Sequence, residues 1–85
     1  MSRQHHYLKI KPEYFRAIES GKKTFEVRFN DRNFQVYDIL HLQEWVGDEY
    51  TGRHIEAEVT YLLDTPDFCK EGYVIMAIKV INVFN

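Results

Sequence analysis

This chain has little of what would cross-link it, anchor it in a membrane or export it. Its 85 residues include one cysteine, Cys69, so no internal disulfide can form. No apolar run approaches the roughly 20 residues that span a bilayer, and the first residues lack the apolar core of a signal peptide. We therefore expect a cytoplasmic protein with no membrane partner, in which Cys69 is a structural or exposed thiol rather than a nucleophile.

Proline and glycine are also scarce, with two and four residues, and no repeat or low-complexity linker interrupts the chain. The hydrophobic content of 45% and the aromatic content of 15% are typical of a folded globule rather than a disordered segment. We expect residues 1–85 to form a single domain with one small core.

The net charge of −2 argues against a dedicated non-specific nucleic-acid binder, and we expect no DNA duplex as partner. The charge is unevenly distributed, however. Residues 1–32 carry eight basic and four acidic side chains, whereas residues 33–85 carry three basic and nine acidic ones. This polarity suits a local anionic ligand, and the alternative is a random unevenness of surface charge.

The most informative stretch runs from Gly21 to Phe29. Gly21 is a typical helix terminator, and the residues after it alternate strictly, as in a strand. Thr24, Glu26 and Arg28 share one face, and Phe25, Val27 and Phe29 share the other. The pattern predicts the apolar face in the core, which leaves Glu26 and Arg28 together on the opposite face, with Lys23 at the strand mouth. Such a group would orient a polar, planar ligand; the alternative is a solvated face with a surface ion pair worth about 0–1 kcal/mol.

Hydrophobic periodicity predicts a strand, a helix and then four further strands. The expected strands are 7–11, 24–29, 39–45, 53–63 and 73–81, and the helix is 12–20. Pro12 suits the first helical position, and Leu8 and Ile10 point inward from the first strand. The last strand is apolar on both faces, which is typical of a buried central strand. We expect an α+β, mostly β fold in which a curled sheet of five to six strands closes into a small barrel plugged by the helix.

Nine short segments carry a family resemblance and cover nearly the whole chain in order: 8–10, 12–15, 20–28, 30–32, 34–40, 44–45, 50–53, 59–61 and 72–75. On these residues the chain resembles a small ASCH-type domain of the PUA-like superfamily, in particular a short bacterial and phage family of unknown function. Residues 21–28 are fairly specific to the superfamily. Tyr37 departs from the pattern, because such domains often have glycine there.

The resemblance implies a β-barrel whose cleft, between helix and barrel mouth, binds single-stranded RNA or a nucleotide-like small molecule without a cofactor. The residues that it places at the cleft are Lys9, Lys23, Glu26 and Arg28, with Arg32 and Trp45 as further contributors. A guanidinium such as that of Arg28 chelates phosphate or a base edge bidentately. Trp45 would stack an unpaired base or, alternatively, cap the core beside a hairpin.

One relative in the superfamily is an amidohydrolase that removes an acetyl group from acetylated cytidine. There, the lysine matching Lys23 activates a threonine at the position that Glu26 occupies here, and a glutamate comes from a helical insertion that residues 64–72 do not provide. We therefore assign no catalytic residue and favour binding over catalysis. A small amidohydrolase acting on modified nucleosides and a phage-type protein-interaction module are the alternatives.

The four histidines raise the question of a metal site. His5 and His6 are neighbours and would point to opposite faces of a strand, while His41 and His54 flank a hairpin. Two histidines without a cysteine or a regularly spaced carboxylate are a weak signal, so we predict no metal site.

Overall fold

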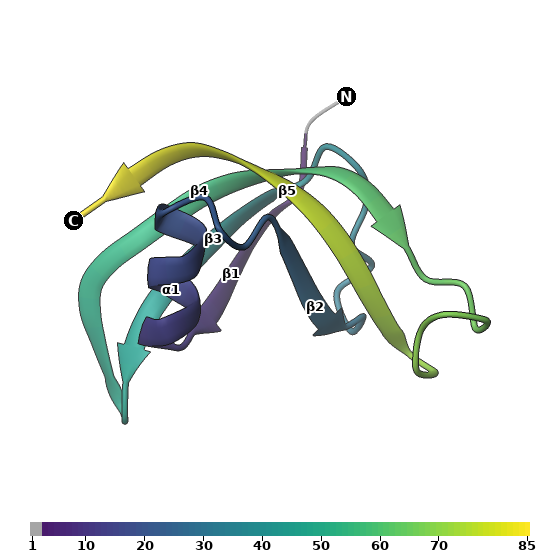
Figure 1. Cartoon of the computed structure of the whole chain (residues 1–85), viewed down its shortest axis with the longest axis horizontal. Coiled ribbons are helices and arrows are strands. Elements are labelled where there is room, and N and C mark those ends of the chain that lie inside the picture. Colours follow the sequence, from purple (N-terminus) through teal and green to yellow (C-terminus); the bar gives the residue numbers. More distant parts are fainter. Residues whose placement is uncertain (1–2) are drawn as a thin grey trace.

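The computed structural model describes residues 3–85 as one curled sheet and one helix (Figure 1). The elements in chain order are β1 (His5–Ile10), α1 (Pro12–Glu19), β2 (Phe25–Phe29), β3 (Ile39–Val46), β4 (Glu49–Leu63) and β5 (Tyr73–Phe84). The sheet has the order β1-β3-β4-β5-β2. β1 pairs with β3 in parallel, and the other neighbours pair antiparallel.

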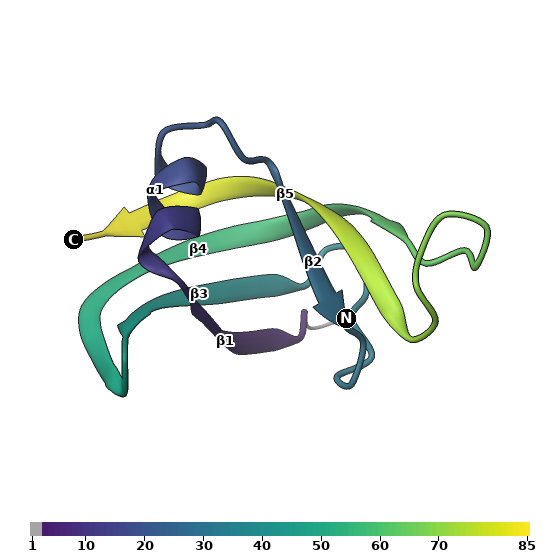
Figure 2. The ribbon, with the colours of Figure 1, turned by 60° about the horizontal axis from the view of Figure 1, so that its bottom comes forward.

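The sheet curls into a half-barrel, and α1 lies within its concave side (Figures 1 and 2). α1 packs on β3, β4 and β5 through Phe15 and Ile18, which are fully buried. This confirms the mostly β class and the single helix after the first strand. The core consists of buried apolar residues from the helix, a loop and four of the strands: Leu8, Ile10, Phe15, Ile18, Phe34, Leu40, Leu42, Ile55, Ala57, Val59, Val74, Met76 and Ile78. Within residues 3–85 no helix has the length and hydropathy to span a membrane.

The half-barrel stays open between its two edge strands, β1 and β2. Two arginine side chains cross this gap. Arg28 Nη2 donates to the carbonyl of Lys9 at 2.9 Å, and Arg32 Nη1 donates to the carbonyl of Tyr7 at 3.0 Å. Carbonyls two residues apart point to the same side of a strand, so both belong to the free edge of β1. Side chains, rather than a backbone ladder, therefore connect the two edges.

The structure contradicts the predicted orientation of β2. Phe25, Val27 and Phe29 are 44%, 49% and 55% exposed, whereas Glu26 is only 4% exposed. The core is already filled by α1 and the other strands, so the inner face of β2 borders a polar pocket instead. A carboxylate is tolerated there because both of its oxygens are paired with cations. Leu8 and Ile10 are buried, as predicted.

The element boundaries differ from the prediction mainly around the hairpin. β4 begins at Glu49, so only Gly47 and Asp48 form the turn where a loop over 46–52 was expected. β5 extends to Phe84, and beyond Ile78 its residues are exposed. The prediction of a strand buried on both faces is therefore wrong, although β5 does lie between two other strands. The helix ends as expected, because Gly21 takes a φ of +81° and reverses the chain.

A buried hydrogen bond fastens the loop before β3 to β1. His6 Nε2 lies 2.8 Å from Asp38 Oδ2, and the same oxygen accepts the backbone N–H of Gln35 at 2.9 Å. Next to Asp38, Tyr37 adopts a φ of +79°, a left-handed conformation that is unfavourable for a tyrosine. Its N–H bonds the carbonyl of Val59 at 2.7 Å, which holds it there.

Replacing Tyr37 with glycine is expected to raise the free energy of unfolding by about 0.5–1 kcal/mol, because glycine adopts positive φ without strain. The tyrosine ring is 63% exposed, so little packing is lost. Urea unfolding of Tyr37→Gly beside Tyr37→Ala measures this, since alanine removes the ring but keeps the strain. An equal gain in both variants would attribute the effect to the lost ring rather than to the backbone.

Candidate functional site

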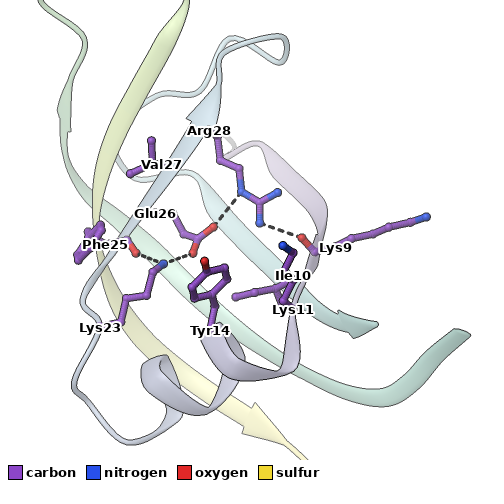
Figure 3. Close-up of a pocket in the computed structure, with 9 residues that line it drawn as sticks. All are labelled: Lys9, Ile10, Lys11, Tyr14, Lys23, Phe25, Glu26, Val27 and Arg28. Atoms are coloured by element: carbon purple, nitrogen blue, oxygen red, sulfur yellow. Dashed lines mark hydrogen bonds and ion pairs between the residues drawn. The ribbon is translucent and has the colours of Figure 1, made fainter. Parts of the chain in front are cut away.

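A pocket of about 500 Å³ opens between the inner face of β2, the end of β1 and the start of α1 (Figure 3). The residues that line it are Lys9, Ile10, Lys11, Tyr14, Lys23, Phe25, Glu26, Val27 and Arg28. Glu26 and Arg28 project to one side of β2, and the side chains of Phe25 and Val27 lie on its other side (Figure 3).

Glu26 is the central group of the pocket. Its Oε1 accepts from Lys23 Nζ at 2.6 Å, and its Oε2 accepts from Arg28 Nε at 2.9 Å. The Glu26 side chain is almost inaccessible, whereas those of Lys23 and Arg28 are 18% and 25% exposed. The spacing of the strand explains the arrangement, because residues 26 and 28 share a face and Lys23 folds back from the chain entering β2. The two cations therefore surround a buried carboxylate and remain open to the pocket.

The cations keep hydrogen-bonding capacity for a ligand. Lys23 Nζ also donates to the carbonyl of Phe25 at 2.7 Å, which leaves one of its three N–H groups. Arg28 directs Nε to Glu26 and Nη2 to Lys9, so its Nη1 has no partner within residues 3–85. The pocket therefore offers donors rather than acceptors, and apart from Lys9 its lining has three residues with cationic side chains, Lys11, Lys23 and Arg28, against one carboxylate.

The other predicted site residues are placed differently. Lys9 contributes its carbonyl, while its ammonium points away from the pocket and lies 4.0 Å from the centre of the Trp45 ring (Figure 3). Trp45 is half-buried beside Tyr50 and does not line the pocket; its Nε1 is buried without a partner within residues 3–85. Arg32 also lies outside the lining, where it binds the edge of β1 and pairs with Asp31 at 3.7 Å.

Five lining residues were not among the predicted site residues: Ile10, Lys11, Tyr14, Phe25 and Val27. The first three lie at the junction of β1 and α1. Lys11 is the residue before the helix, whose first turn begins with Pro12, and Tyr14 is an exposed residue of that turn that lines the pocket. The predicted start of the helix could have indicated these residues. The connection between β1 and α1 is short, so the first helical residues must lie next to the end of β1.

Each of the four histidines lies within hydrogen-bond distance of a neighbouring side chain. His6 and His5 lie on opposite faces of β1 as predicted, with His6 buried. His5 Nδ1 lies 2.8 Å from His41 Nε2, and the other nitrogen of His41 faces Glu56 at 3.6 Å, so the groups do not converge on one point. No cluster of three metal-ligating side chains occurs in the described part of the chain. Burial lowers the pKa of His41, against the opposing attraction of Glu56.

Comparison with known proteins relates this chain to a family. A family model described as a domain of unknown function, DUF3850, matches residues 5–78. The chain belongs to the DUF3850 family. An uncharacterized 12.9 kDa protein of Escherichia phage P2, named for its position in the GpA 3′ region, is 41% identical over 71 residues. These cover 84% of this chain and 64% of the phage protein, so the DUF3850 chain spans less than two thirds of that relative.

Proposed function

We propose that the DUF3850 chain is an RNA- or nucleotide-binding domain that holds its ligand in the polar pocket beside β2. The observation that supports this most directly is the buried Glu26 with Lys23 and Arg28 around it. The carboxylate fixes the two cations in place, so a ligand meets preorganised donors and little side-chain entropy is lost on binding. A volume of about 500 Å³ is in the range of small-molecule and cofactor sites.

The free groups favour an anionic, acceptor-rich ligand. The Nη1 edge of Arg28 and the remaining N–H of Lys23 match phosphate oxygens or the acceptor edge of a base. The Tyr14 ring offers a flat wall for a base or sugar. The resemblance to ASCH-type domains of the PUA-like superfamily points to the same ligand class, and we extend the proposal to membership of that superfamily.

Binding of mononucleotides and short single-stranded RNA tests the proposal by calorimetric titration. Affinity is expected to fall as salt rises, with a log–log slope set by the few phosphates neutralised. Lys23→Ala should weaken binding. Arg28→Lys should weaken it as well, because lysine keeps the positive charge but lacks the planar pair of N–H donors that binds an anion bidentately. Lys79→Ala is the control, since Lys79 is an exposed cation of β5 outside the pocket. Equal losses in all three variants, or binding that salt does not change, would contradict the proposed site.

The pocket gives less support to the amidohydrolase alternative. Lys23 Nζ donates to both a carboxylate and a carbonyl, so its two bonds hold it against Glu26 and the backbone rather than beside a hydroxyl that it could activate. Thr24 is exposed and lies outside the lining.

We expect no turnover of acetylated cytidine, and we expect Glu26→Gln to change ligand affinity rather than a reaction rate. A chromatographic assay with acetylcytidine checks this. If the wild-type chain deacetylates acetylcytidine faster than the uncatalysed reaction, and Lys23→Ala abolishes this activity, the function is hydrolysis rather than binding.

A further inference from the structure

The faces of β2 are reversed relative to the prediction from the sequence, with its apolar side chains exposed. A block of apolar side chains therefore lies on the outer face of the sheet. The strand register places Phe25 opposite Ala77 and Val27 opposite Ile75 across β2 and β5. Across β5 and β4 it places Ala77 opposite Tyr61. We call this block the outer apolar patch, and its members are Phe25, Val27, Phe29, Tyr61, Leu63, Tyr73, Ile75 and Ala77.

The patch lies on three adjacent strands, β4, β5 and β2, whose order along the sheet can be followed in Figure 2. Tyr61 is 64% exposed, and Phe25, Val27 and Phe29 are each about half exposed. Together the members present on the order of 500 Å² of apolar surface, near the upper end of what a monomer leaves uncovered. With the polar rim that surrounds any interface, such a patch approaches the ~800 Å² that each partner contributes to a stable complex.

The chemistry of the patch favours a second copy of the same chain. No member is itself charged, and the two lysines that border the patch, Lys23 and Lys70, lie against the rings of Phe25 and Tyr73. In a two-fold contact each residue approaches the symmetry copy of its own surface, where like charges would repel. Two copies of an uncharged apolar surface can pack against each other in such a contact without charge repulsion. We propose that the outer apolar patch is the interface of a homodimer.

The dimer contact would lie on the opposite face of β2 from the pocket side chains Glu26 and Arg28. It would leave these groups accessible, and it would also fix Phe25, whose ring centre lies 4.9 Å from Lys23 Nζ. The proposal does not depend on which ligand the pocket binds.

Sedimentation equilibrium over a range of concentrations tests the proposal. The wild-type chain is expected to reach about twice the 10.2 kDa of one chain. Val27→Glu should shift the dissociation constant upward at least tenfold, because each chain would bury an unpaired carboxylate in the apolar interface. Val46→Glu is the matched control, since Val46 is 58% exposed at the end of β3, outside the patch.

Circular dichroism and thermal melting establish that each variant is folded, and Tyr61→Glu on β4 decides the matter if Val27→Glu does not fold. A wild-type chain that keeps the single-chain mass at several hundred micromolar would overturn the proposal, because an interface of this size gives tighter association. Equal dissociation by Val46→Glu would overturn it as well.

Discussion

Arg28→Ala is expected to lower the free energy of unfolding by about 2–3 kcal/mol. The substitution removes two hydrogen bonds at once. Glu26 Oε2 loses its partner at 2.9 Å while remaining buried, and the Lys9 carbonyl at the free edge of β1 loses its donor. A buried carboxylate with an unpaired oxygen is costly, because Lys23 alone then remains to neutralise it. Urea denaturation followed by circular dichroism measures the change.

Arg32→Ala is the matched control for this prediction. Arg32 also bridges to β1, through the Tyr7 carbonyl, but its side chain is 43% exposed and touches no buried charge. We expect a loss of less than about 1 kcal/mol, since solvent takes the place of an exposed donor. If both variants lose the same free energy of unfolding, the loss comes from the hydrogen bond to the edge of β1 that both arginines make. The pairing of Arg28 with Glu26 would then contribute nothing further.

Period-two alternation located β2 correctly but assigned its faces wrongly. Alternation states that residues 25, 27 and 29 share a face and that residues 26 and 28 share the other. It does not state which face is inside, and the usual rule of apolar residues inward failed here. The rule failed because the inner face of an edge strand meets a pocket, where Glu26 is neutralised by Lys23 and Arg28. Local sequence rules break most often at such sites.

The candidate site was predictable where it depended on spacing along one segment. Lys23, Glu26 and Arg28 lie within six residues, so their proximity followed from the strand itself. The contribution of Lys11 and Tyr14 depends on how α1 packs against the curled sheet, which periodicity does not determine. Trp45 and Arg32 lie outside the pocket lining for the same reason, because the curvature of the sheet decides which side chains of β3 and of the loop before it reach the pocket.

The parallel pairing of β1 with β3 was likewise beyond the sequence pattern. A strand alternates in the same way whether its neighbour is parallel or antiparallel. The edge position of β1 follows from this pairing and leaves the carbonyls of Tyr7 and Lys9 free for the two arginines. The open half-barrel thus results from long-range pairing, whereas the individual strands result from local composition.

A pair of glycines offers a second test with a built-in comparison. Gly21 and Gly72 have nearly the same φ, +81° and +82°, so alanine introduces nearly the same backbone strain at both. They differ in what a new Cβ would contact. At Gly21 nothing lies within 4 Å, whereas at Gly72 the Cβ would lie 2.5 Å from Cε1 of Phe29.

Gly21→Ala is expected to lower the free energy of unfolding by about 1 kcal/mol, and Gly72→Ala by about 2 kcal/mol. The excess at Gly72 arises because the half-exposed Phe29 ring must move off the glycine and away from Tyr73, whose ring centre lies 5.5 Å away. Urea unfolding at one protein concentration measures both values. The deciding measurement is Gly72→Ala in a chain that also carries Phe29→Ala. Without the Phe29 ring, Gly72→Ala should lower the free energy of unfolding by no more than Gly21→Ala does. An excess that persists in that background would place the strain in the backbone around Gly72 rather than in its contact with Phe29.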